Sequence, residues 1–158
     1  MTNTEKIKNV IEKYSDIVYK IAITRTGSIE NAEDIFQEVF IKYSQKNPNF
    51  ENEEHEKAWF IKVTINLTKN LHNEAWNRKT IPLEENIKFE NKEEEDVFSA
   101  VNQLPQNYKT VIYLFYYEGY KVKEISKIMN TREGTIKTWL SRARESLKEK
   151  IKGGFEDE

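Results

Sequence analysis

The chain has 158 residues and a formal net charge of −2, and 37% of its residues are hydrophobic, which suits one ordinary domain or two small ones and excludes a disordered chain. The absence of cysteine excludes disulfide frameworks and thiolate chemistry, and no glycine-rich arrangement resembles a phosphate-binding loop. No stretch approaches the roughly 20 apolar residues of a membrane span, and the first segment lacks a signal-peptide core, so we expect no membrane span and a cytoplasmic location.

Three amphipathic helices are predicted in the first half of the chain. Apolar residues recur at steps of three and four over residues 7–21, which predicts a helix that ends near Gly27. A second helix is predicted over residues 29–45. A third, over about residues 56–75, is apolar over much of its circumference, so we expect it to be central to a helical bundle.

An acidic segment separates the two halves of the chain. Helical periodicity fades over residues 77–96, Pro82 intervenes, and the segment ends in a run of acidic residues. We therefore expect a first domain over residues 1–76, a linker over residues 77–96 and a second domain over residues 97–158. No strand is predicted, so the expected fold class is all-α: two small helical domains joined by an acidic linker.

The second domain has the spacing of a helix-turn-helix. Helices predicted at residues 96–103 and 106–118 precede a short helix at residues 122–129, and a longer helix follows after a break. Asn130 occupies the break and is one of the few residue types other than glycine that tolerate a left-handed backbone. Thr131 is suited to cap the longer helix.

The longer helix presents polar and cationic side chains on the face away from its apolar stripe. Between residues 121 and 152 there are 10 basic and 4 acidic side chains, and a local excess of positive charge attracts a polyanion. The candidate DNA contacts are Thr131, Arg132, Glu133, Thr135, Lys137, Thr138, Ser141, Arg142 and Arg144. Among them, we expect Arg132, Glu133, Lys137 and Thr138 to reach bases. Arg142 and Arg144, together with Lys148, are expected to reach the phosphate backbone. The alternative is a solvated basic face on two packed helices.

Three sequence motifs resemble those of one protein family. The segment TREGTIKTWLSRARESLKEKI, with the preceding LPQNYKTVIYLFYYEGYKVKEISKIMN, resembles the C-terminal promoter-binding domain of bacterial extracytoplasmic-function (ECF) sigma factors. NAEDIFQEVFIKYSQ resembles that family's core-polymerase-binding helix, and AWFIKVTINLTKN resembles its −10 helix. The resemblance implies a cytoplasmic initiation factor without catalysis, cofactor or small-molecule substrate. Its partners would be core RNA polymerase, promoter DNA with −35 and −10 elements, and an anti-sigma factor.

The resemblance also assigns candidate contacts in the first domain. The expected polymerase contacts share the side of the second helix opposite its apolar stripe: Asp34, Gln37, Glu38 and Ile41. The stripe Ile35, Phe36, Val39 and Phe40 is expected to be structural. An isolated surface isoleucine such as Ile41 also needs no functional explanation.

Amides, ammonium groups and aromatic rings on and before the third helix are suited to bind a melted strand. The expected −10 contacts are Asn49, Phe50, Trp59, Lys62, Asn66, Lys69, Asn70 and Asn73, although Trp59 could equally be half core. The resemblance makes Asn49, Phe50 and the polar residues after them the pocket for a flipped base. This copy departs from the family pattern because Glu51, Glu53, Glu54 and Glu56 make the loop acidic, which predicts weak −10 duplex binding.

Two other classes of protein are weighed. A free-standing helix-turn-helix regulator would bind its operator alone, usually as a dimer. An enzyme is disfavoured because the only histidines, His55 and His72, have neither metal-ligand nor triad spacing, and we expect both on polar surfaces.

Overall fold

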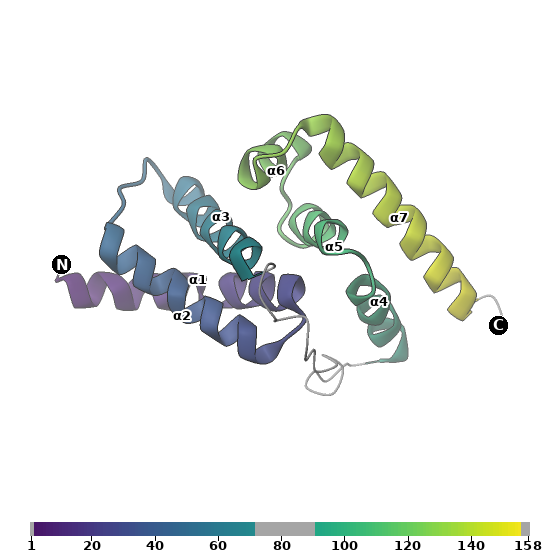
Figure 1. The fold of residues 1–158 in the computed structure, drawn as a ribbon, viewed down its shortest axis with the longest axis horizontal. Helices are drawn as coiled ribbons and strands as arrows, with labels where there is room; N and C mark the ends of the chain where they lie inside the picture. Colours follow the sequence, from purple (N-terminus) through teal and green to yellow (C-terminus); the bar gives the residue numbers. More distant parts are fainter. Residues whose placement is uncertain (1, 72–90, 156–158) are drawn as a thin grey trace. The chain divides into compact units, whose positions relative to one another are not determined.

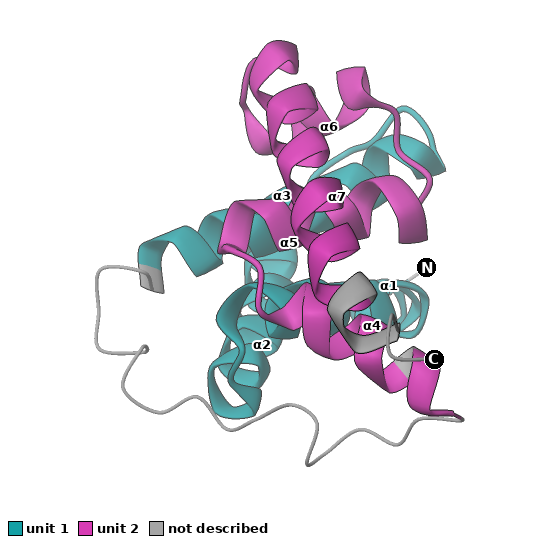
Figure 2. Ribbon diagram, turned by 90° about the vertical axis from the view of Figure 1, so that its right-hand side faces the viewer, with its two compact units in different colours: residues 1–80 teal, residues 81–158 magenta. Residues whose placement is uncertain are grey.

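The computed structural model describes residues 2–71 and 91–155, and within these ranges every regular element is a helix (Figure 1). The chain divides into two compact units, residues 1–80 and 81–158 (Figure 2). The predicted all-α class with a C-terminal helix-turn-helix is confirmed. Most of the predicted acidic linker lies outside the described residues.

The first unit is a bundle of α1 (Asn3–Thr26), α2 (Ile29–Lys46) and α3 (Glu53–Leu71). A capping box starts α1, because the Thr2 hydroxyl accepts a hydrogen bond from the Glu5 backbone N–H and the Glu5 carboxylate accepts one from the Thr2 N–H. As predicted, α1 ends at Gly27, whose φ of 65° is the left-handed conformation that ends many helices.

Aromatic rings fill the centre of this bundle. The Phe60 side chain is fully buried, and its ring centroid lies 4.6 Å from that of Tyr14, 5.5 Å from that of Phe40 and 5.4 Å from that of Tyr43. These rings join all three helices, so burial of this cluster supplies much of the hydrophobic free energy that holds them together. The third helix begins at Glu53, three residues earlier than predicted, because the Asn52 side chain accepts a hydrogen bond from the His55 backbone N–H at 2.8 Å.

The second unit contains α4 (Lys92–Asn102), α5 (Gln106–Ile112), the π-helical segment η3 (Tyr113–Tyr117), α6 (Val122–Met129) and α7 (Glu133–Phe155). Two predicted boundaries differ. The expected helix at residues 96–103 begins at Lys92, so the end of the predicted linker is helical. The expected helix at residues 106–118 changes to π geometry after Ile112, and the Glu118 backbone N–H donates to the Tyr113 carbonyl five residues back.

The turn between α6 and α7 is built around Asn130. Its φ of 51° is left-handed, as predicted, and the Thr131 backbone N–H donates to the Ser126 carbonyl at 3.0 Å. The prediction that Thr131 caps α7 is wrong. Its hydroxyl donates to the Met129 carbonyl at 3.0 Å, and α7 begins two residues later at Glu133.

Candidate nucleic-acid interface

One face of α7 carries most of the predicted DNA contacts. Ile136, Leu140 and Ala143 are buried against the rest of the second unit. On the opposite side, the exposed residues are Arg132, Glu133, Lys137, Thr138, Ser141 and Arg142, and Thr135 is half-buried beside them. The helix therefore brings these side chains together on one open surface, while Thr131 lies half-buried in the turn before it.

Two residues shape the centre of this surface. The Thr138 hydroxyl donates its hydrogen to the Gly134 carbonyl of the same helix at 3.0 Å, so in this conformation it can act toward DNA only as an acceptor. Thr138 is exposed, and its oxygen lone pairs and methyl group are of the kinds that can contact base amino groups and thymine methyl groups. A Cβ atom at Gly134 would meet nothing within 4 Å, so the glycine is not required by packing in the free protein.

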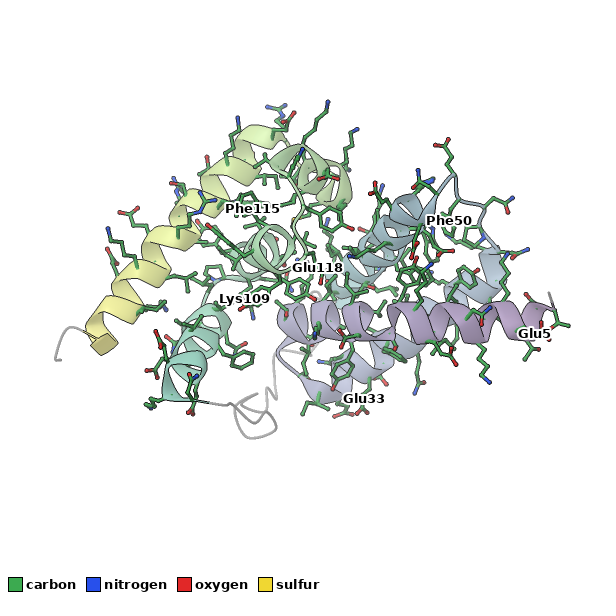
Figure 3. All side chains as sticks on the ribbon, turned by 180° about the vertical axis from the view of Figure 1, so that it is seen from behind. Glu5, Glu33, Phe50, Lys109, Phe115 and Glu118 are labelled. Carbon is green, nitrogen blue, oxygen red and sulfur yellow. The ribbon has the colours of Figure 1, made fainter. Side chains whose placement is uncertain are left out.

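Arg144 differs from the other predicted DNA contacts. Its Nε donates to the Tyr116 hydroxyl at 2.5 Å, and its guanidinium carbon lies 5.3 Å from the centre of the Phe115 ring and 5.5 Å from that of Tyr116. Phe115 belongs to η3 and is labelled in Figure 3. Arg144 therefore joins α7 to the π-helical segment by hydrogen bonding and cation–π attraction.

The predicted polymerase contacts also lie together. Asp34, Gln37 and Glu38 are exposed on α2, and Ile41 is 46% exposed among them. The opposite stripe is less uniform than expected. Ile35, Val39 and Phe40 are buried, whereas Phe36 is half-buried and faces a shallow hollow beside Tyr19 on α1.

The third helix presents a polar face. Lys62, Asn66, Lys69 and Asn70 are exposed along α3, and Asn73 lies outside the described residues. Trp59 is half-buried, with its ring centroid 5.0 Å from that of Phe60 and 5.9 Å from that of Phe50. The indole is therefore part of the core on one side and partly exposed on the other, while its role as a −10 contact stays a prediction.

The loop between α2 and α3, residues 47–52, continues this polar face. Asn49 is exposed, and Phe50 is half-buried with its ring 5.5 Å from that of His55 (Figure 3). The Nδ1 atom of the exposed His55 accepts a hydrogen bond from the Glu51 backbone N–H at 3.4 Å. A three-ring series from His55 through Phe50 to Trp59 thus leads from the loop to the core.

The sequence did not indicate that α1 holds this loop. Lys13 Nζ lies 2.7 Å from Glu53 Oε1 and 3.8 Å from Glu56 Oε1, and the Tyr14 hydroxyl donates to Glu56 Oε1 at 2.6 Å. The hydrogen bond with Glu53 raises the pKa of Lys13 above its ordinary value. These contacts join residues about 40 positions apart, so no local pattern could have predicted them.

Other kinds of site are not seen in the part of the chain that the structure describes. Over residues 2–71 and 91–155, no histidine, aspartate and glutamate side chains gather into a group that could hold a metal ion. No helix over the same ranges is long and apolar enough to cross a membrane.

Over the residues that the structure describes, the protein thus consists of two helical units, and the second has the helix-turn-helix arrangement of many DNA-binding proteins. Two protein-family models match the sequence: the model of sigma-70 region 2 matches residues 10–78, and the model of sigma-70 region 4 matches residues 94–147. The RNA polymerase sigma factor SigV of Bacillus subtilis is 30% identical over 130 residues, which cover 79% of this chain and 78% of SigV. The ECF RNA polymerase sigma factor SigW of the same organism is 26% identical over 164 residues, which cover 91% of this chain and 88% of SigW.

A solved structure has the same fold. The sigma factor RpoE from Bartonella quintana, in complex with the anti-sigma factor NepR, matches with a TM-score of 0.73 and 22% identity over 94% of this chain and 98% of RpoE. The chain belongs to the sigma-70 family and, within it, to the ECF group of RNA polymerase sigma factors.

Proposed function

We propose that this sigma factor docks on core RNA polymerase through α2 and reads promoter DNA with one surface on each unit. The observation that carries the proposal is that polar and cationic faces on α3 and α7 lie in the segments matched as sigma-70 regions 2 and 4. Each face backs onto a buried apolar stripe, so the exposed cations and amides on it are not needed for the core.

The α7 face is the proposed −35 reader. Arg132, Glu133, Lys137 and Thr138 lie at or near the N-terminal end of the helix, which is the end that reaches base edges in helix-turn-helix complexes. Ser141 and Arg142 lie further along and are proposed to contact phosphates. Thr131 and Thr135 flank the surface, and Arg144 is proposed to hold α7 in place through Tyr116 as well as to approach the backbone.

The α3 face and the α2–α3 loop are the proposed −10 reader. Melted strands need stacking surfaces for bases and cations for phosphates. Phe50 and Trp59 offer rings, Lys62 and Lys69 offer cations, and Asn49, Asn66, Asn70 and Asn73 offer amides. The acidic loop opposes DNA phosphates, which supports weak binding of the −10 duplex by the free protein.

Core polymerase is the proposed partner of the exposed α2 residues Asp34, Gln37, Glu38 and Ile41. An exposed isoleucine surrounded by polar groups suits a protein interface with a small apolar centre. We further propose an anti-sigma partner, a cytoplasmic location and no catalysis of its own. The structural relative RpoE, which is in complex with an anti-sigma factor, supports the first of these.

Reconstitution with core polymerase tests the proposal. Purified chain and core polymerase are mixed with a randomised promoter library, and transcripts are selected and sequenced. We expect co-elution of the chain with core polymerase and enrichment of two separated sequence elements. Operator binding by a dimer without polymerase, with no promoter-dependent transcription, would instead indicate a free-standing regulator.

A further inference from the structure

The two ends of the α2–α3 loop are held by the same neighbouring helix. At the first end, Lys6 Nζ donates to the Asn47 side-chain oxygen at 2.8 Å and lies 5.9 Å from the centre of the Tyr43 ring. Asn47 is the left-handed residue that ends α2, with φ of 43°. Lys6 of α1 thus contacts Asn47, the residue at which the loop begins.

At the second end, Lys13 and Tyr14 of α1 contact the first turn of α3. Lys13 pairs with Glu53 and Glu56, and the buried Tyr14 donates its hydroxyl hydrogen to Glu56. Two of the four carboxylates that make the loop region acidic, those of Glu53 and Glu56, therefore lie beside the Lys13 cation of α1. The other two carboxylates, those of Glu51 and Glu54, are exposed.

We infer that Lys6, Lys13 and Tyr14 are positioning residues for −10 recognition, which hold loop residues 47–52 and the adjoining start of α3 in the conformation that receives the base. This inference rests on the proposed −10 role of the loop. We name these three residues, with their partners Asn47, Glu53 and Glu56, the α1 brace.

The geometry of the loop explains why such a brace matters. Only six residues connect α2 and α3, and Phe50 lies between His55 and Trp59 in the ring series. A displacement at either end of so short a loop would shift Phe50 relative to Trp59. Exposed charge pairs contribute little to global stability, so their loss is expected to change the loop conformation rather than unfold the bundle.

Matched charge changes separate positioning from general electrostatics. Lys13→Met and Lys20→Met each remove one exposed cation from α1, but Lys20 pairs with Asp16 on its own helix, away from the loop. Glu53→Gln/Glu56→Gln and Glu12→Gln/Glu33→Gln each remove two negative charges from the first unit, but only the first pair belongs to the brace. Glu12 and Glu33 are exposed on α1 and α2, outside the loop. Within each comparison, the change in net charge of the protein is the same.

The experiment uses holoenzyme reconstituted from core polymerase and the full chain. Transcription is measured from the library-selected promoter and from versions with each −10 base replaced, with −35 replacements as an internal reference. We expect Lys13→Met and Glu53→Gln/Glu56→Gln to lower discrimination at −10 about two- to fivefold and to leave discrimination at −35 unchanged. Lys20→Met and Glu12→Gln/Glu33→Gln should keep the wild-type −10 discrimination.

Four results would overturn the inference or its basis. Wild-type −10 discrimination by Lys13→Met, or an equal loss in Lys20→Met, would overturn the brace alone. A parallel loss of core-polymerase affinity and of transcription from every promoter would overturn it in favour of a purely structural role. Absence of −10 discrimination in the wild-type holoenzyme would instead overturn the proposed role of the loop itself.

Discussion

The Arg25 side chain of α1 donates from Nε to the Thr68 hydroxyl of α3 at 2.5 Å, and Arg25 is only 2% exposed. The Thr68 hydroxyl in turn donates to the Ile65 carbonyl at 2.6 Å. Burial lowers the pKa of Arg25 to about 10, which still leaves the guanidinium charged at neutral pH. A buried cation therefore joins the end of α1 to the helix that carries the proposed −10 face.

Replacing Thr68 by valine should destabilise the first unit by about 1–3 kcal/mol, because the change leaves a buried, charged donor without this acceptor. Thr64→Val is the matched control. Thr64 is equally buried on α3, and its hydroxyl donates to the Phe60 carbonyl of its own helix at 2.6 Å. Hydrogen exchange at buried amides of α3 measures the opening free energy, and equal losses in the two variants would contradict the importance of the Arg25 contact.

The sequence predicted the parts of the fold that depend on local periodicity. The spacing of apolar residues in α1, α2 and α6 gave the buried faces, and it also placed Lys137, Thr138 and Arg142 on the open side of α7. Turn chemistry gave Asn130, because few side chains accept a left-handed backbone. These features need only neighbouring residues, so a single sequence contains enough information.

The sequence did not predict features that depend on contacts between distant residues. The Lys13–Glu53 and Arg25–Thr68 contacts join helices whose register is fixed only when the bundle forms. The early start of α4 at Lys92 was missed because the charged composition of its first turn resembles that of a linker. The role proposed for the α1 brace residues could not be predicted either, because each one alone resembles an ordinary surface or core residue.

Substitution at Asn130 should separate backbone strain from side-chain contacts. Asn130→Ala should cost the second unit about 1–2 kcal/mol, because alanine disfavours the observed φ of 51°. Asn130→Gly should stay within about 0.5 kcal/mol of the wild type, because glycine adopts this conformation readily. Hydrogen exchange at amides of α6 and α7 gives the comparison, and a larger loss in the glycine variant would point to a role of the Asn130 amide group instead.

Gly134→Ala should have opposite effects on stability and on DNA binding. The free protein has room for the added methyl group, so the variant should gain up to about 0.5–1 kcal/mol from the better helix propensity of alanine. In the −35 complex, the same methyl group would project from the proposed DNA-binding face and reduce close approach of the helix to the groove. Thermal unfolding and duplex binding are measured side by side. Unchanged affinity for the −35 duplex would show that the DNA does not approach Gly134.

Replacing Lys137 or Arg142 by alanine should weaken DNA binding in two different ways. Lys137→Ala should weaken binding to the preferred −35 duplex by roughly 1–3 kcal/mol and have little effect on a duplex with altered −35 bases, as expected for a base contact. Arg142→Ala should weaken binding to both duplexes equally and lower the slope of log affinity against log salt by about 0.9, as expected for one lost phosphate contact.

Fluorescence anisotropy with the full chain at several salt concentrations separates these two predictions. Because both side chains are exposed and outside the apolar stripe of α7, neither substitution should change the unfolding temperature of the second unit, which serves as the control. A uniform loss on both duplexes for Lys137→Ala would reassign Lys137 to the phosphate backbone. A selective loss for Arg142→Ala would move base recognition about two and a half helical turns further along α7 than the position of Arg132 and Glu133 implies.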